Sequence, residues 1–214
     1  MLAHKLRRAG VFPSVLSSQS STDVDGGSTV TVTLPGSIVS GNLLVAIVSE
    51  EQARTATWPA GWTELLDYAP GASGLHVGYR VADGAEGASI TVTLSSTAAA
   101  ASSLVYKISG AGSTIYGGTA TGTSATPDPP SLSPAPGYKK YLWLSVVSGR
   151  DALTSIDTYP ANYTNGQKLE TADGFGAFLG VAERLSTASS DDPGTFGVGA
   201  SAEWYAATIA IPSA

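Results

Sequence analysis

The side chains best suited to acid–base chemistry in this chain are its two histidines and several carboxylates. Some of these carboxylates are close neighbours in the sequence. A serine nucleophile needs a histidine as its general base and a carboxylate to orient that histidine. His4 lies near the start of the chain, and His76 lies within the strand-like stretch GLHVGYRVA. No serine stands in the Gly-x-Ser-x-Gly pattern that marks a strained nucleophile turn. We therefore expect His76 to be a half-exposed strand residue without a catalytic role.

Pairs of carboxylates roughly 5–9.5 Å apart across a cleft are the catalytic groups of most glycosidases. Neighbouring carboxylates form three candidate pairs: Glu50 with Glu51, Glu64 with Asp67, and Asp83 with Glu86. Each pair is expected at a strand end or turn, where carboxylates are normally solvated, and no feature of the sequence favours one pair. A glycan-degrading enzyme is therefore the third-ranked hypothesis, and we predict a protein that is not an enzyme.

Metal ligands are sparse in this sequence. The chain has no cysteine, which excludes disulfides and thiolate metal sites. The stretch 23–27, Asp-Val-Asp-Gly-Gly, resembles the start of a calcium loop but lacks its further oxygen ligands and distal glutamate. The stretch 191–194, Asp-Asp-Pro-Gly, is a second acidic turn. Because Asp beside Gly is common in turns, we expect two turns, with no metal and no cofactor.

The charge of the chain is distributed unevenly. Only 13% of the 214 residues are charged, and the formal net charge is −6. Three of the 11 basic residues are Lys5, Arg7 and Arg8, so the remainder has eight basic and 17 acidic residues, a balance of −9. Such a body is repelled by nucleic acid and by anionic membranes, and neither is an expected partner. No apolar run has signal-peptide or membrane-span length, so we expect an unprocessed cytosolic product.

Strand patterns fill most of the chain, whereas helical periodicity is nearly absent. Alternating or continuous apolar runs bounded by turn residues predict strands within 28–36, 42–49, 74–82, 88–95, 102–109, 140–148, 175–186, 194–201 and 203–213. Many short strands with regular turns are typical of a β-sandwich or jelly roll. We therefore predict an all-β fold.

Two similar phrases, TWPAGWT at 57–63 and TYPANYT at 158–164, indicate an internal repeat. In each, proline suits the second position of a type I turn, and Gly61 or Asn162 suits a position with positive φ. Each phrase therefore predicts a turn between two strands, with an aromatic ring on either side.

Four further matches keep the same order along the chain. They are 43–49 with 142–148, Gly78 with Gly180, Thr91-Val92 with Thr195-Phe196, and Val105 with Ile209. Loop insertions explain the small drift in offset, and we infer a duplication with halves at about 21–110 and 125–214. A Gly/Thr/Pro-rich segment, 110–137, joins them as an extended crossover without ladder hydrogen bonds. We favour a single sandwich over residues 21–214; two small tandem β-sandwiches are the alternative.

The aromatic residues of the repeated phrases have two interpretations. Trp58, Trp62, Tyr159 and Tyr163 flank the turns. Exposed rings can stack on sugars, whereas rings that recur in both halves favour a packing role. Packing is the preferred interpretation, and glycan stacking is the alternative.

Several stretches resemble accessory structural proteins of tailed bacteriophages, prophages and gene-transfer-agent-like particles. The most telling are YRVADGAEGASITVTLS at 79–95 and DPPSLSP at 128–134, and the resemblance covers the chain from about residue 20 onward. It implies a virion protein with a β-sandwich fold, made in the bacterial cytoplasm and bound to the major capsid protein or other virion subunits. It implies no catalytic residues.

The start of the chain completes the hypothesis. Residues 1–20 are expected to form an extended arm, which Lys5, Arg7, Arg8 and Phe12 would anchor on an acidic neighbour. The first hypothesis is a non-enzymatic capsid decoration, cement or head-spike protein that docks through this arm and a sheet face and forms homo-oligomers. The alternative is a carbohydrate-binding module of a tail tip or fibre that binds a host surface glycan.

Overall fold

The protein folds entirely into β-strands within the residues that the structure describes. The computed structural model describes residues 10–214 except 25, 99, 151–152 and 172–175. The strands are β1 (Ser14–Asp23), β2 (Thr29–Thr33), β3 (Leu43–Glu50), β4 (Ala56–Thr57), β5 (Thr63–Tyr68), β6 (Gly74–Val81), β7 (Ser89–Leu94), β8 (Ala101–Ser109), β9 (Tyr116–Ser124), β10 (Lys139–Arg150), β11 (Ile156–Thr158), β12 (Thr164–Glu170), β13 (Ala177–Ala188), β14 (Gly197–Val198) and β15 (Ala202–Pro212). The predicted all-β class is confirmed.

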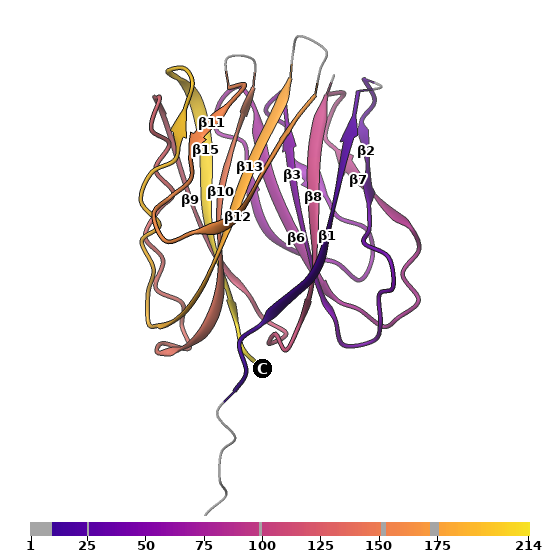
Figure 1. The fold of residues 1–214 in the computed structure, drawn as a ribbon. Helices are drawn as coiled ribbons and strands as arrows, with labels where there is room; N and C mark the ends of the chain where they lie inside the picture. Colours follow the sequence, from indigo (N-terminus) through magenta and orange to yellow (C-terminus); the bar gives the residue numbers. More distant parts are fainter. Residues whose placement is uncertain (1–9, 25, 99, 151–152, 172–175) are drawn as a thin grey trace, which may run out of the picture.

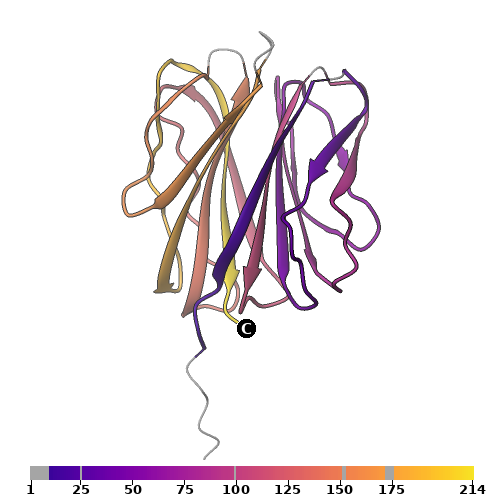
Figure 2. The same cartoon turned by 45° about the vertical axis from the view of Figure 1, so that its right-hand side comes forward.

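Two five-stranded antiparallel sheets face each other, as Figures 1 and 2 show. The first has the order β1-β8-β3-β6-β5, and the second has the order β12-β13-β10-β15-β9. A small sheet, β2-β7-β4, covers the outer face of the first, and the pair β11-β14 lies over the second. The fold is therefore a β-sandwich whose two main sheets are each covered on the outside as well.

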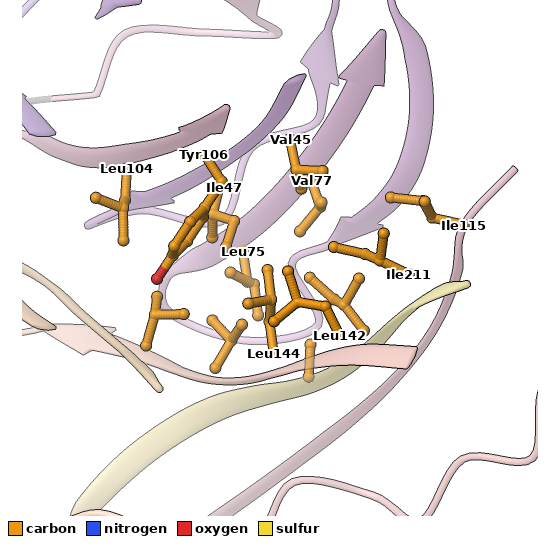
Figure 3. Close-up of a cluster of buried hydrophobic side chains, with 14 of the residues drawn as sticks. Val45, Ile47, Leu75, Val77, Leu104, Tyr106, Ile115, Leu142, Leu144 and Ile211 are labelled. Carbon is orange, nitrogen blue, oxygen red and sulfur yellow. The ribbon is translucent and has the colours of Figure 1, made fainter. Parts of the chain in front are cut away.

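The core between the main sheets comes from alternate residues of the central strands. In β3, Val45 and Ile47 face this core, while in β10 the corresponding side chains are Leu144 and Val146 (Figure 3). The intervening residues of β3 pack instead against the small sheet. Because β3 and β10 are buried on both faces, their sequences are almost continuously apolar. Each fully buried side chain of this kind stabilises the fold by about 1.5–3 kcal/mol.

The two main sheets have equivalent strand orders. Read from its other edge, the second sheet has the order β9-β15-β10-β13-β12. β1, β8, β3, β6 and β5 of the first sheet occupy the places of β9, β15, β10, β13 and β12 in the second. The 99-residue offset between β3 and β10 brings Ser49 Oγ within 2.7 Å of Ser148 Oγ, a buried contact between corresponding residues. Both buried hydroxyls are therefore hydrogen-bonded to each other, near the ends of β3 and β10.

Two of the sequence matches are corrected by the ladders. Ala46 pairs with Val105 and with Gly78, whereas Ser145, its counterpart, pairs with Thr208 and Ala182. Val105 therefore corresponds to Thr208, one residue from the predicted partner, and Gly78 corresponds to Ala182. A one-residue shift reverses the face of a strand, which is why Val105 faces the small sheet and Ile209 the shared core.

The repeated phrases form turns, with one correction. Gly61 and Asn162 have φ values of +84° and +66°, as predicted. The N–H of Trp62 donates to the carbonyl of Pro59 at 3.1 Å, which places the proline first in the turn and not second. A positive φ at the third position is typical of a type II turn, so type I was wrong. Each turn carries the chain from a small sheet to a main sheet.

Two predicted segments contain strands that the sequence did not indicate. Within 110–137, β9 pairs with β15 along its whole length, so the expectation of no ladder hydrogen bonds was wrong. A Cβ at Gly117 would lie 3.2 Å from Leu65, so a bare backbone lets β9 approach the opposite sheet. Within 1–20, β1 begins at Ser14 and pairs with β8, so the last part of the expected arm belongs to the sheet.

Candidate functional site

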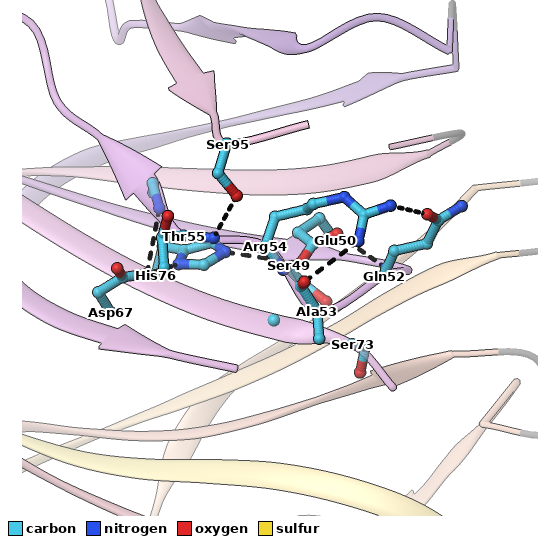
Figure 4. A network of polar contacts seen from close by, with 12 residues as sticks. Ser49, Glu50, Gln52, Ala53, Arg54, Thr55, Asp67, Ser73, His76 and Ser95 are labelled. Atoms are coloured by element: carbon cyan, nitrogen blue, oxygen red, sulfur yellow. Dashed lines mark hydrogen bonds and ion pairs between the residues drawn. The ribbon is translucent and has the colours of Figure 1, made fainter. Parts of the chain in front are cut away.

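A histidine lies between two carboxylates in the first main sheet (Figure 4). His76 is fully buried, which corrects the expectation of a half-exposed residue. Its Nδ1 lies 2.7 Å from Asp67 Oδ1, and its Nε2 lies 3.8 Å from Glu50 Oε1. We call Glu50, Asp67 and His76 the acid–histidine cluster; Glu50 and His76 are fully buried, whereas Asp67 is exposed at the edge of the sheet.

The ladders of the first main sheet place these three side chains together. Asp67 of β5 is paired with His76 of β6, and Glu50 at the end of β3 is paired with Gly74. A Cβ at Gly74 would overlap the Glu50 carboxylate and would lie 2.6 Å from His76 Nε2. The absence of a side chain at Gly74 therefore makes the space that the cluster occupies.

Hydrogen bonds hold both carboxylates in place. Glu50 is fully buried and accepts the N–H groups of Gln52 at 2.8 Å and Arg54 at 3.0 Å. Asp67 accepts the N–H of Ala56 at 3.2 Å. The cluster therefore joins the loop after β3 and the small sheet to the main sheet.

The electrostatics of the cluster favour an imidazolium. Burial alone would lower the pKa of His76, but the neighbouring Asp67 and Glu50 carboxylates raise it above its ordinary value of 6.5. Burial would raise the pKa of Asp67, but the hydrogen bond with His76 lowers it below 3.8. His76 and Glu50 have no exposed surface, whereas the side chain of Asp67 is 20% exposed, so the cluster reaches solvent only through Asp67.

The remaining candidate carboxylates have different surroundings. Glu51 is buried, so the expected solvation was wrong for it as well as for Glu50. Asp83 and Glu86 both hold Arg80, at 2.5 Å from Nη2 and 3.1 Å from Nε respectively. Glu64 is exposed in β5. The predicted pairs thus take part in loop and strand contacts.

The four aromatic residues of the repeated phrases lie in packing contacts. Trp58 and Trp62 stack with ring centroids 5.7 Å apart, and Trp58 lies directly over Gly78. Tyr159 lies over Gly166 in the same way, because a Cβ at Gly166 would lie only 2.5 Å from the tyrosine ring. Tyr163 is buried and belongs to the outer cluster of the second sheet. The glycan-stacking role of these rings stays a prediction.

In the second acidic turn Asp191 is buried, whereas Asp192 is exposed. The Tyr163 hydroxyl donates to Asp191 Oδ2 at 2.5 Å, and Arg184 Nη1 lies 2.6 Å from Asp191 Oδ1. In the first acidic turn, Asp23 accepts the N–H of Thr31 at 2.9 Å, while Asp25 lies outside the described residues. No group of three His, Asp or Glu side chains in the described part of the chain is arranged to hold a metal ion.

A cavity of about 230 Å³ opens between β1 of the first main sheet and β12 and β13 of the second. We call it the edge slot. Its lining includes the side chains of Pro13, Val15, Leu142, Asn165, Glu183 and Leu185. Burial raises the pKa of the Glu183 carboxyl, although hydrogen bonds from Asn165 Nδ2, at 3.1 Å, and the Tyr106 hydroxyl partly oppose this. The slot therefore combines apolar walls with one buried acid.

Exposed apolar side chains gather at one end of the sandwich, the end at which β1, β3 and β10 begin. We call it the arm end. Of the seven large hydrophobic residues exposed in the described residues, all but Val24 belong to this end: Val11, Leu16, Val39, Val81, Tyr138 and Leu185. Figure 1 shows that residues 10–13, which precede β1, extend from the body at the same end.

Of the expected anchor residues, only Phe12 lies in the described part of the chain. Phe12 is half-buried, and Lys140 Nζ lies 5.2 Å from the centroid of its ring. Lys5, Arg7 and Arg8 lie outside the described residues, as does His4. Their role stays a prediction.

The sequence reasoning did not single out Glu183. The signal was present in AFLGVAERLS, where Glu183 follows Leu179 and Val181 at the spacing of one strand face. A carboxylate at an inward position of a period-two pattern is unusual, and such positions merit attention.

Comparison with models of protein families, with curated proteins and with solved structures found no match to this chain. Within the described residues, no helix is long and apolar enough to cross a membrane.

Proposed function

We propose that this chain is a non-enzymatic structural component of a tailed-phage virion, a capsid decoration, cement or head-spike protein. It docks on neighbouring virion subunits through its N-terminal segment and the arm end. The observation that supports this proposal best is the gathering of exposed apolar side chains at the arm end, with Val11 78% and Tyr138 76% exposed. Clustered exposed apolar side chains commonly mark protein interaction sites.

The covered faces of the sheets direct the docking to this end. The small sheet β2-β7-β4 packs on the outer face of the first main sheet through Ala46, Val48 and Val105. The outer face of the second is covered through clusters around Trp143, Phe178 and Phe196. Docking through a main-sheet face, which the sequence suggested, is thereby disfavoured. We propose docking through the arm end instead.

We also propose that the two halves arose by duplication within one sandwich. The matching strand orders and the contact of Ser49 with Ser148 support this history. Both halves contribute to one shared core, which favours a single sandwich over two tandem ones. A rigid module of this kind suits a particle component, because the arm end keeps a fixed geometry relative to the core.

The test is binding of the purified chain to emptied particles of its own phage. The informative variant replaces Lys5, Arg7 and Arg8 by alanine, because deletion of residues 1–20 would remove part of β1. Tyr138→Ser tests the apolar surface, and Val24→Ser at the opposite end is its matched control. We expect saturable binding by the unaltered chain, loss in the first two variants and no change in the control. Absence of binding by the unaltered chain would contradict the proposal and lead next to a glycan-binding assay with Trp62→Ala.

A further inference from the structure

At the edge slot, corresponding positions of the two halves carry different side chains. Val45 pairs with Tyr79 in the first sheet, and Leu144, the counterpart of Val45, pairs with Glu183 in the second. The Tyr79 ring packs against the shared core. The side chain of Glu183 is shorter and carries a carboxyl group, and this residue borders the open slot. One half therefore fills the position with an aromatic ring, whereas the other keeps an acid beside a cavity.

The chemistry of the slot suits a long cationic side chain. Val15, Leu142 and Leu185 offer apolar surface to an aliphatic stem, and the carboxyl of Glu183 would accept hydrogen bonds from a charged head. In the described part of the chain Glu183 forms no ion pair. The neighbouring guanidinium of Arg184 is already held by Asp191 at 2.6 Å. The buried carboxyl, only 7% of whose residue is exposed, thus lacks a counter-charge.

We propose that the edge slot binds a lysine or arginine side chain supplied by the N-terminal segment, residues 1–9, of a second copy of this chain. The inference rests on the docking role proposed above for that segment and names its site on a neighbouring copy. Charge complementarity supports it, because three of the 11 basic residues lie among the first eight positions and the rest of the chain has a balance of −9.

The course of the chain next to the slot favours a second copy as the donor. Pro13 and Val15 form a wall of the slot. Before Pro13 the chain runs to Gly10 beside Ser213, whose Oγ would lie 3.1 Å from a Cβ at Gly10. Residues 10–12, the first that the structure describes, therefore run along the C-terminal end of the chain and outward from the body at the arm end (Figure 1). Contacts of this head-to-tail kind generate rings or open chains of subunits.

The experiment measures binding of a fluorescent peptide with the sequence of residues 1–12 to the full chain at low salt. We expect saturable binding that Glu183→Gln weakens roughly tenfold or more, because the cation then loses its charged partner. Glu64→Gln is the matched control, since it makes the same change at an exposed edge position of the first half and should leave binding unaltered. A peptide with Lys5, Arg7 and Arg8 replaced by alanine should not bind.

Two further readouts keep the proposal testable if Glu183→Gln folds poorly. Leu185→Arg, at a position 55% exposed, should fill the slot with its own guanidinium and abolish peptide binding. In the unaltered chain, an NMR pH titration with carboxyl-labelled glutamate should show that the pKa of Glu183 falls when the peptide saturates the slot. Equal peptide binding by the unaltered chain and by Glu183→Gln would overturn the proposal.

Sedimentation velocity decides which copy supplies the segment. Concentration-dependent association of the full chain, lost in Glu183→Gln, supports a second copy. A monomer that binds the peptide only after its own Lys5, Arg7 and Arg8 are replaced would show that each slot holds its own segment, which overturns the proposal. If particle binding needs residues 1–9 while the slot binds no peptide, this inference fails and the proposed function stands.

Discussion

The two halves fill the space between main sheet and outer layer in opposite ways. In the first half this space holds Glu50, Asp67 and His76, whereas the ladders place Gly149, Lys168 and Gly180 at the corresponding positions of the second. There the side chains of Leu153 and Ile156 occupy the room over Gly149 and Gly180. Lys168 turns outward to the carbonyl of Thr154, at 2.6 Å.

This difference shows that the same backbone arrangement can hold either ionisable or apolar side chains between the main sheet and the outer layer. A buried ion pair contributes little net stability compared with well-packed apolar residues, but removal of one member leaves an uncompensated charge. The first half should therefore be sensitive to changes of charge and pH, and the second to changes of shape.

The largest effect is expected for His76→Leu, which leaves the buried Glu50 without its cationic neighbour. The free energy of unfolding should fall by about 3–5 kcal/mol, the usual cost of breaking a buried ion pair from one side. Urea unfolding of the variant and the unaltered chain measures the difference. Gly180→Ala, at the corresponding position, is the comparison: it tests shape alone because its Cβ would overlap Ile156. A loss below 1 kcal/mol for His76→Leu would show that the cluster is not electrostatically coupled.

Gly74→Ala should be the next most damaging change. Its methyl group would overlap the Glu50 carboxylate and press on His76, and overpacking of this kind costs about 1–3 kcal/mol. Gly36→Ala is the control, because no heavy atom lies within 4 Å of a Cβ built there. Thermal unfolding of both variants would decide the matter, and equal midpoints would argue against a tightly filled cluster.

A smaller effect is expected in the second half for Tyr163→Phe. The change removes the hydroxyl that donates to Asp191, while Arg184 continues to hold that carboxylate. The loss of a hydrogen bond to a charged group should lower the free energy of unfolding by about 1–2 kcal/mol. The same urea experiment checks this value.

The smallest effect is the pH dependence that the cluster adds. The pKa of His76 is raised in the folded state, so its contribution is fully present below pH 6.5 and is lost as pH rises through the folded pKa. The pKa of Asp67 is lowered, so its contribution is present above pH 3.8 and is lost as pH falls through the folded pKa. The stability difference between the unaltered chain and His76→Leu should therefore be greatest between these values. A difference that does not change with pH would refute the charged state assigned to the cluster.

The parts of the fold that the sequence predicted are those that local patterns determine. The apolar runs of β3 and β10 needed only their own residues, and the turn at Gly61 needed only its turn chemistry. The edge strands β5 and β12 were missed because bulges interrupt their alternation and β12 is largely polar. Strand β9 was missed because its glycines suit both a loop and a close-packed strand.

The functional groups were harder to predict, because their surroundings come from strands far apart in the chain. His76 was correctly placed in a strand, but its burial depends on Asp67 and Glu50, which adjacent strands bring to it. The apolar character of the arm end likewise depends on loops that only the topology brings together. A sequence pattern indicates which face of a strand is buried. The composition of a site depends in addition on which strands are neighbours in the sheet.

The contact between Ser49 and Ser148 also bears on how such a chain could have evolved. Under the proposed duplication, an ancestral half-length chain would have paired with its own copy, with two identical serines meeting on a symmetry axis. Fusion of two copies makes that pairing independent of protein concentration, because the partner is always tethered. It also frees each copy from the symmetry constraint, so one could keep a histidine and two acids while the other acquired Leu153 and Ile156. The asymmetry of the modern halves is thus the expected trace of a homodimer that became a single gene.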